Sequence, residues 1–172
     1  MLSGTLKQID LETNETTILL EHLQEGQYVS SEDGQMLAYQ TDETASEVVV
    51  MNFAEDTEQR VSADEGAKIL PLGFVLGDFV YGMAKEENIG KTGSGETVQG
   101  MHYLEIRDKS NTIVKTYEIP GTYIIDVSVK GNMITLERAL KNRDTYNVIA
   151  EDYITNNVES ASTIELKSYW TD

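Results

Sequence analysis

The sequence lacks several features that would narrow its function directly. It contains no cysteine, which excludes disulfides and thiolate chemistry, and only two prolines beside 13 glycines, a balance typical of a fold with many tight turns. No apolar run reaches the roughly 18 residues that a membrane-spanning helix needs, so direct membrane insertion is not expected. The first residues also lack the basic and apolar regions of a signal peptide.

Basic residues are scarce as well. Thirteen Lys and Arg face 30 Asp and Glu, for a net charge of −17. The excess is concentrated in residues 1–66, where 15 acids face only Lys7 and Arg60, a net charge of −13. Such a field repels phosphate groups and anionic lipid surfaces, so nucleic acid is not expected as a partner. Solubility is the simplest role of this charge.

Helical periodicity is absent, and short apolar or alternating runs bounded by turn residues recur instead. These runs are rich in Val, Ile, Tyr and Thr, which suit half-buried strands. We expect strands at residues 5–11, 16–20, 35–41, 47–53, 69–76, 79–84, 101–107, 113–119, 123–129, 133–140, 146–150 and 163–169.

Glycine-containing turns give these strands a period. Three of them each lie between two apolar runs, as a tight hairpin requires: Asp33-Gly34, Gly77-Asp78 and Lys130-Gly131-Asn132. An Asp-Gly pair predicts a type I′ turn with positive φ at Gly34. Their glycines are 43 and 54 residues apart, and the longer interval holds a polar, glycine-rich insertion at residues 85–100. We interpret this insertion as a mobile surface loop that could be shortened without loss of folding.

A repeat of about 40–50 residues with four short strands is the blade signature of a β-propeller. One such unit cannot bury both of its faces, whereas stacked units can. The predicted fold is therefore all-β, a single β-propeller segment (1–172) of about three and a half four-stranded antiparallel blades. We place half a blade at 1–21, blades at about 26–64, 68–120 and 122–160, and an extra strand at 163–170.

One stretch carries a family resemblance. Residues 31–39, Ser-Glu-Asp-Gly-Gln-Met-Leu-Ala-Tyr, followed by Val-Val-Val-Met-Asn at 48–52, resemble the repeat of TolB-type propellers and of the N-terminal propeller of dipeptidyl peptidases. The family usually reads Ser-Pro-Asp-Gly, and Glu32 replaces the proline. The resemblance implies a scaffold in an extracellular or cell-envelope protein, with the anchor or signal outside this segment. It carries over no catalytic residue, because that family's peptidase chemistry resides in a separate hydrolase domain.

Motifs that suggest chemistry are incomplete. Gly90-Lys91-Thr92 matches the end of a phosphate-binding loop, but Lys85 stands where that loop needs glycine. Asp10, Glu12 and Asn14, with Glu21 beyond them, approach a calcium-loop spacing, but Glu15 occupies the glycine position. We interpret both as surface turns or loops.

Nucleophile and zinc patterns are missing too. His22 and His102 are the only histidines, too few for a zinc site without cysteines. Gly93-Ser94-Gly95 lacks the Gly-x-Ser-x-Gly spacing of a nucleophile elbow. We therefore expect no catalytic, cofactor-binding or metal-binding residues.

Tyrosine dominates the aromatic residues, with nine Tyr beside three Phe and one Trp. Seven tyrosines fall within or beside predicted strands: Tyr28, Tyr39, Tyr81, Tyr103, Tyr117, Tyr123 and Tyr146. We expect them to pack between blades, with each hydroxyl reaching water or a backbone group. The alternative is an aromatic surface for glycans or peptides at one mouth of the propeller.

These observations favour a non-catalytic binding or scaffold module of a bacterial cell-envelope protein. The partner would be a protein or a glycan, and the sequence does not identify the binding residues. The alternative is an accessory propeller that gates access to a hydrolase domain elsewhere in the parent chain. Because a partial propeller leaves strand edges and apolar faces open, we also expect self-association into a homodimer.

Overall fold

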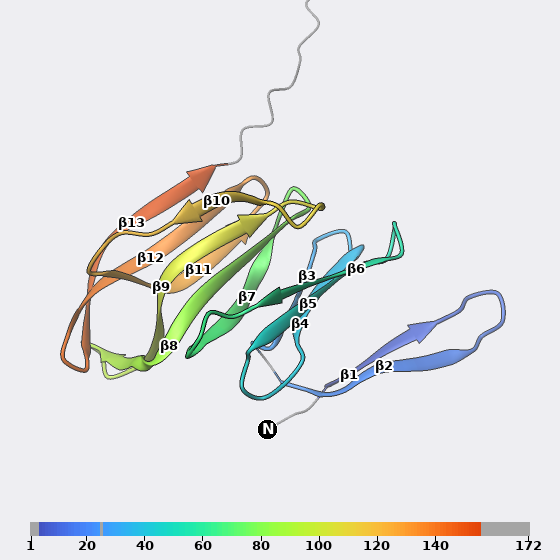
Figure 1. Cartoon of the computed structure of the whole chain (residues 1–172), viewed down its shortest axis with the longest axis horizontal. Helices are drawn as coiled ribbons and strands as arrows, with labels where there is room; N and C mark the ends of the chain where they lie inside the picture. Colours follow the sequence, from blue (N-terminus) through green and yellow to red (C-terminus); the bar gives the residue numbers. More distant parts are fainter. Residues whose placement is uncertain (1–3, 25, 156–172) are drawn as a thin grey trace, which may run out of the picture.

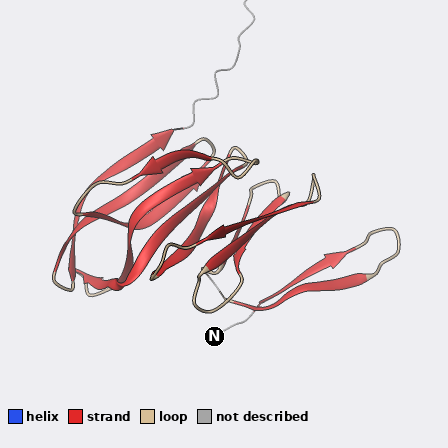
Figure 2. Cartoon of the chain, viewed as in Figure 1, coloured by secondary structure: helices blue, strands red, loops and turns tan. Residues whose placement is uncertain are grey.

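The chain forms strands joined by turns and loops (Figures 1 and 2). The computed structural model describes residues 4–24 and 26–155. In this part of the chain the strands are β1 (Gly4–Ile9), β2 (Thr16–Leu23), β3 (Tyr28–Ser30), β4 (Met36–Gln40), β5 (Glu47–Asn52), β6 (Thr57–Ser62), β7 (Ala67–Val75), β8 (Asp78–Thr92), β9 (Thr97–Arg107), β10 (Ile113–Tyr117), β11 (Thr122–Lys130), β12 (Met133–Asn142) and β13 (Thr145–Thr155). The predicted all-β class is confirmed.

The strands assemble into three sheets that follow one another along the chain (Figure 1). β1 and β2 form a separate hairpin, and β3 to β6 form an antiparallel sheet in chain order. The third sheet has the order β10-β9-β11-β12-β13-β8-β7, and β8 also pairs with β9. It combines two antiparallel units, β7 to β10 and β11 to β13, so the arrangement is that of a β-propeller segment.

We call β3–β6, β7–β10 and β11–β13 the first, second and third blades. The strand that begins each blade lies on the same side of the segment, because β3 and β11 both contact β7. The extra strand predicted at 163–170 lies outside the described residues. Within those residues, no helix has the length and apolar character needed to cross a membrane.

Two apolar cores lie between the blades, on opposite faces of β8. Phe79, Tyr81 and Met83 belong to the core shared with the first blade. Val80 and Ala84 belong to the core shared with the third blade. Successive side chains of a strand point to opposite faces, so a strand buried on both sides reads as a continuous apolar run.

The first predicted turn differs from the structure in its type. Gly34 has positive φ (69°), as predicted, but Asp33 does not, and a type I′ turn requires it at both central residues. β3 ends at Ser30 and β4 begins at Met36, and Gly34 N–H donates to Ser31 O at 3.0 Å. The Ser31 hydroxyl accepts from Met36 N–H at 2.9 Å, which joins the two ends of the five-residue loop. The turn is therefore a β-turn closed by a left-handed glycine.

The second hairpin turn is shifted by one residue from its predicted place. Leu76 and Gly77 both have positive φ (52° and 87°), and Val75 pairs directly with Asp78. The type I′ turn is thus Leu76-Gly77 rather than Gly77-Asp78. Leucine is a rare residue in this conformation, because its Cβ is crowded there.

Gly34→Val is expected to lower the free energy of unfolding by about 1 kcal/mol or more, because a β-branched residue strains the left-handed backbone. A Cβ at Gly34 would meet nothing within 4 Å, so the backbone alone produces the effect. Gly93→Val is the control, since a Cβ there also meets open space and its φ is not positive. Equal chemical-denaturation midpoints for the two variants would contradict the prediction.

The expectation of a mobile loop at residues 85–100 is wrong. β8 continues to Thr92 and β9 starts at Thr97, with Ile89 paired to Gln99 and Lys91 paired to Thr97. We call residues 85–100 the strap. Its end reaches the third blade, where Thr145 of β13 pairs in parallel with Lys91. The second and third blades thus form one sheet through two junctions, the strap with β13 and β9 with β11.

Candidate functional site

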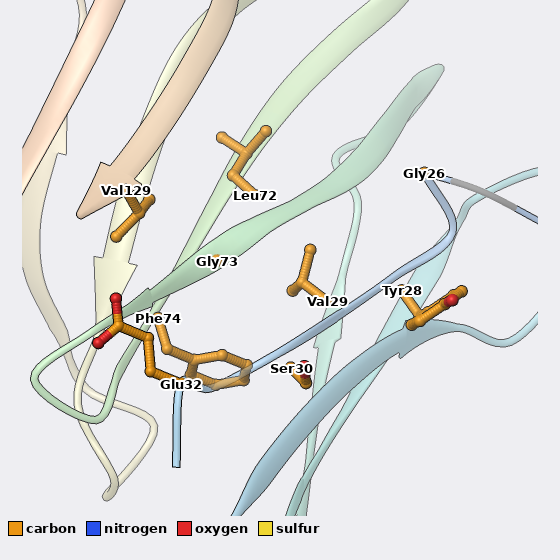
Figure 3. A pocket seen from close by; sticks show the side chains of 9 residues that line it. All are labelled: Gly26, Tyr28, Val29, Ser30, Glu32, Leu72, Gly73, Phe74 and Val129. Atoms are coloured by element: carbon orange, nitrogen blue, oxygen red, sulfur yellow. The ribbon is translucent and has the colours of Figure 1, made fainter. Parts of the chain in front are cut away.

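A groove of about 380 Å³ lies where the first strands of the three blades come together (Figure 3). We call it the inner-strand groove. Figure 3 shows Val29 between β3 and β7, and Val129 of β11 on the other side of Gly73. The groove is lined by Gly26, Tyr28, Val29, Ser30, Glu32, Leu72, Gly73, Phe74 and Val129.

The β7 wall of the groove depends on an irregular strand. The pairing register with β8 shifts between Pro71 and Gly73, which is a β-bulge. A Cβ at Gly73 would lie 3.0 Å from Val129 Cγ2, so glycine lets β7 approach β11 this closely. The bulge leaves Leu72 and Phe74 beside the groove, where they supply an apolar floor.

The charged groups at the rim are acidic. Glu32 is exposed and forms no hydrogen bond or ion pair with any described residue. Asp33 accepts hydrogen bonds from the Ser31 hydroxyl (2.6 Å) and from Gln35 N–H (3.0 Å), which lower the pKa of its carboxyl group. Lys109 is already paired with Glu55 at 3.6 Å. Among the described residues, the rim therefore offers one carboxylate without a hydrogen-bond or ion-pair partner, that of Glu32.

A second hollow of about 310 Å³ shares Glu32 and Phe74 with the groove. It extends to the turn tips at Leu76-Gly77 and Gly131. Leu76 is exposed there in its unfavourable backbone conformation. The two hollows together run from the inner strands to one end of the segment.

The lining residues define what the groove can do. An apolar floor with a few polar groups at the rim is typical of a binding site. His102 lies outside the groove, on β9. Its ring is edge-on to that of Tyr103, with the ring centres 4.8 Å apart. In the described residues, no group of three or more His, Asp or Glu side chains could hold a metal ion. The arrangement supports binding and shows no nucleophile paired with a base.

The incomplete motifs lie in ordinary strands and turns. Gly90-Lys91-Thr92 is part of β8. Asp10 accepts from the backbone N–H of Glu12 (2.8 Å) and Thr13 (3.0 Å), so its carboxylate caps the turn between β1 and β2. Gly93-Ser94-Gly95 forms the turn at the tip of the strap.

The tyrosines pack between strands, but three of the hydroxyls donate to carboxylates, where water or a backbone group was expected. Tyr103 donates to Asp64 (2.7 Å), Tyr117 donates to Asp152 (2.8 Å), and Tyr81 donates to Glu105. Tyr146 donates to the backbone carbonyl of Asn88 at 2.6 Å. Tyr28, by contrast, is 45% exposed and lines the groove.

Sequence reasoning did not identify the groove. Among its residues, the sequence singled out Tyr28 as one of seven tyrosines in or beside predicted strands, and Glu32 as a replacement for proline in the repeat. Leu72, Gly73 and Phe74 belong to a run that reads as an ordinary strand, and Val129 is distant in sequence. Only the bulge and the packing of β7 on β11 bring them together.

Comparisons with known proteins give no family. No family model matches the chain, and no curated protein matches it. The chain is similar to the structure of U3-55K (8% identity, TM-score 0.40, 84% of this chain) and to a protein from Lactobacillus plantarum (9% identity, TM-score 0.37, 88% of this chain). It spans 45% and 49% of those chains, about half of their length. The propeller-like assignment therefore rests on the chain's own strand order and packing.

Proposed function

We propose that this segment is a non-catalytic binding module that holds a protein or glycan ligand in the inner-strand groove. The observation that carries the proposal is the meeting of three inner strands around an apolar floor with Tyr28 and Glu32 at its rim. The TolB-type resemblance of residues 31–39 supports a place in a bacterial cell-envelope protein.

A second candidate function is an accessory propeller that controls access to a hydrolase domain of the same parent chain. The groove's position favours it, since inner strands would border the channel of a complete ring. A Gly-x-Ser-x-Gly elbow with later Asp and His in the parent reading frame would support this function over the first.

The test of the binding module uses immobilised peptides and oligosaccharides with the wild-type chain and two tryptophan variants. Ser30→Trp places a large side chain in the groove from an exposed position. Ser94→Trp, at the exposed tip of the strap, is the control. We expect ligands retained by the wild type and by Ser94→Trp to be lost with Ser30→Trp. Equal retention by all three chains would exclude the groove as the binding site.

Self-association stays a prediction. The β1–β2 hairpin presents exposed apolar side chains at Ile9, Leu11 and Ile18, which supports it. The acidic first part of the chain opposes it, more strongly at low salt.

A further inference from the structure

The inner edge of β3 carries backbone groups that its own sheet does not use. β3 is an end strand, and among the described residues it pairs with β4 alone. Gln40 N–H donates to Gln27 O, and Ser31 N–H donates to Met36 O, each at 2.9 Å. Bonded and non-bonded pairs alternate in an antiparallel ladder. Tyr28 and Ser30, which face Tyr39 and Leu37, therefore point their N–H and C=O groups away from β4.

Tyr28 and Ser30 both line the inner-strand groove, so a strand added to this edge would lie along it. Among the described residues, nothing bonds to the backbone N–H of either. An open strand edge of this kind is a template for pairing with another chain.

The neighbouring edge strand is protected in ways that β3 is not. β7 also ends its sheet, but Pro71 has no N–H and the bulge beside it interrupts the edge. β3 contains no proline, and its pairing with β4 has no register shift. Of the two end strands beside the groove, β3 is the one whose uninterrupted edge can pair with an added strand.

Charge indicates what would pair there. Glu32 follows β3 directly and has no partner among the described residues. The nearby Lys109 is engaged with Glu55, and residues 1–66 carry 15 acids against two bases. A basic ligand is attracted to this rim, whereas an acidic one is repelled.

We propose that the inner edge of β3 binds an extended, basic polypeptide segment by strand addition. The ligand's backbone forms hydrogen bonds with the N–H and C=O groups of Tyr28 and Ser30. Its Lys or Arg side chain lies beside Glu32, and its apolar side chains contact Val29 and Phe74. This inference rests on the proposed function and narrows its ligand class. Because the edge offers the groups of two residues, the affinity is modest.

The probe is a short fluorescent peptide of alternating Lys and Val, followed by anisotropy. Matched peptides replace Lys with Ser or with Glu, and a further Lys-Val peptide has every backbone nitrogen methylated, so that neither of its edges can donate to a neighbouring strand. We expect only the unmethylated Lys-Val peptide to bind well, and its affinity to fall with salt. Equal binding of the methylated peptide would overturn strand addition.

Glu32→Gln tests the charge, with Glu43→Gln as the control. Both carboxylates are exposed, so each variant loses one charge and should melt like the wild type. We expect Glu32→Gln to weaken binding of the Lys-Val peptide about twofold to fivefold, as loss of one exposed ion pair does, and Glu43→Gln to leave it unchanged. Equal weakening by the two variants would overturn the role of Glu32.

The remaining outcomes separate this inference from the binding function. If the Ser-Val peptide binds as tightly as the Lys-Val peptide and Ser30→Trp abolishes both, the groove is a binding site but the basic ligand class is wrong. If no peptide binds while an oligosaccharide is retained and lost with Ser30→Trp, strand addition is overturned and the binding function stands. If no ligand of any class depends on Ser30, both proposals fail.

Discussion

Replacing residues 87–98 with a Gly-Asn link is expected to destabilise the seven-stranded sheet by at least about 3–5 kcal/mol, the range for removing the packing of one large buried side chain. Globular domains have about 5–15 kcal/mol of stability in total, so this loss is a large fraction of what holds the second and third blades folded. The sequence alone favoured the opposite result. The structure reverses it, because the strap joins the second blade to β13, in addition to the β9–β11 pairing and the shared apolar core.

The strap makes contacts that a short link cannot replace. Lys91 N–H donates to Asp144 O at 2.8 Å, and Lys141 Nζ donates to Ile89 O at 3.3 Å. Asn88 is buried, with 4% of its surface exposed, and its carbonyl accepts from Tyr146. Removing these residues exposes the face of Tyr146 and leaves Lys141 Nζ, Asp144 O and the Tyr146 hydroxyl without these partners.

Urea unfolding followed by circular dichroism measures the effect of the replacement. Ser94→Ala is the control, since it changes the strap only at its exposed tip and should keep the wild-type midpoint. A shortened chain that unfolds cooperatively at the wild-type midpoint would show that the strap contributes no stability.

Tyr146→Ala is expected to cost about 3–5 kcal/mol, as truncation of a buried aromatic residue does. Tyr146 is fully buried (0% exposed) and meets Tyr123 edge-on, with ring centres 5.5 Å apart. Lys141 Nζ lies 5.5 Å from the centre of the Tyr146 ring, within cation–π range. Burial raises the pKa of Tyr146 to about 12, so the hydroxyl is a neutral donor to Asn88 O.

Two glycines of the strap are explained by this ring. A Cβ at Gly90 would lie 2.8 Å from Tyr146 Cε2, and a Cβ at Gly100 would lie 2.1 Å from its hydroxyl. Both distances are shorter than side chains allow, so each glycine provides the space that the ring occupies. Tyr146→Ala leaves that space empty on both sides, which is why a large cost is expected.

Tyr146→Phe separates the hydroxyl from the ring. It should cost about 1–3 kcal/mol, because the buried carbonyl of Asn88 then loses its donor. Tyr153→Ala, an exposed tyrosine (54%) on the same strand, should change stability little. If Tyr146→Ala and Tyr153→Ala unfold at the same urea concentration, the packing of Tyr146 on the strap contributes nothing.

Period-two apolar runs and glycine turns were enough to predict strands, because side-chain alternation and left-handed turn residues are local properties. The type of the Asp33-Gly34 turn was not predicted correctly, because it depends on a side-chain hydrogen bond. The Ser31 hydroxyl reshapes the Asp33-Gly34 turn by bonding five residues ahead.

The strap and the groove were decided by tertiary structure. The glycines at 90 and 100 indicate flexibility in sequence, yet they serve close packing against Tyr146, whose hydroxyl reaches a carbonyl 58 residues away. The groove likewise requires β3, β7 and β11 to lie together. The close contact of Gly73 with Val129 exists only where the second and third blades are stacked. Local patterns determine which residues form strands. Which strands meet depends on burying apolar faces between sheets, and that is a property of the whole chain.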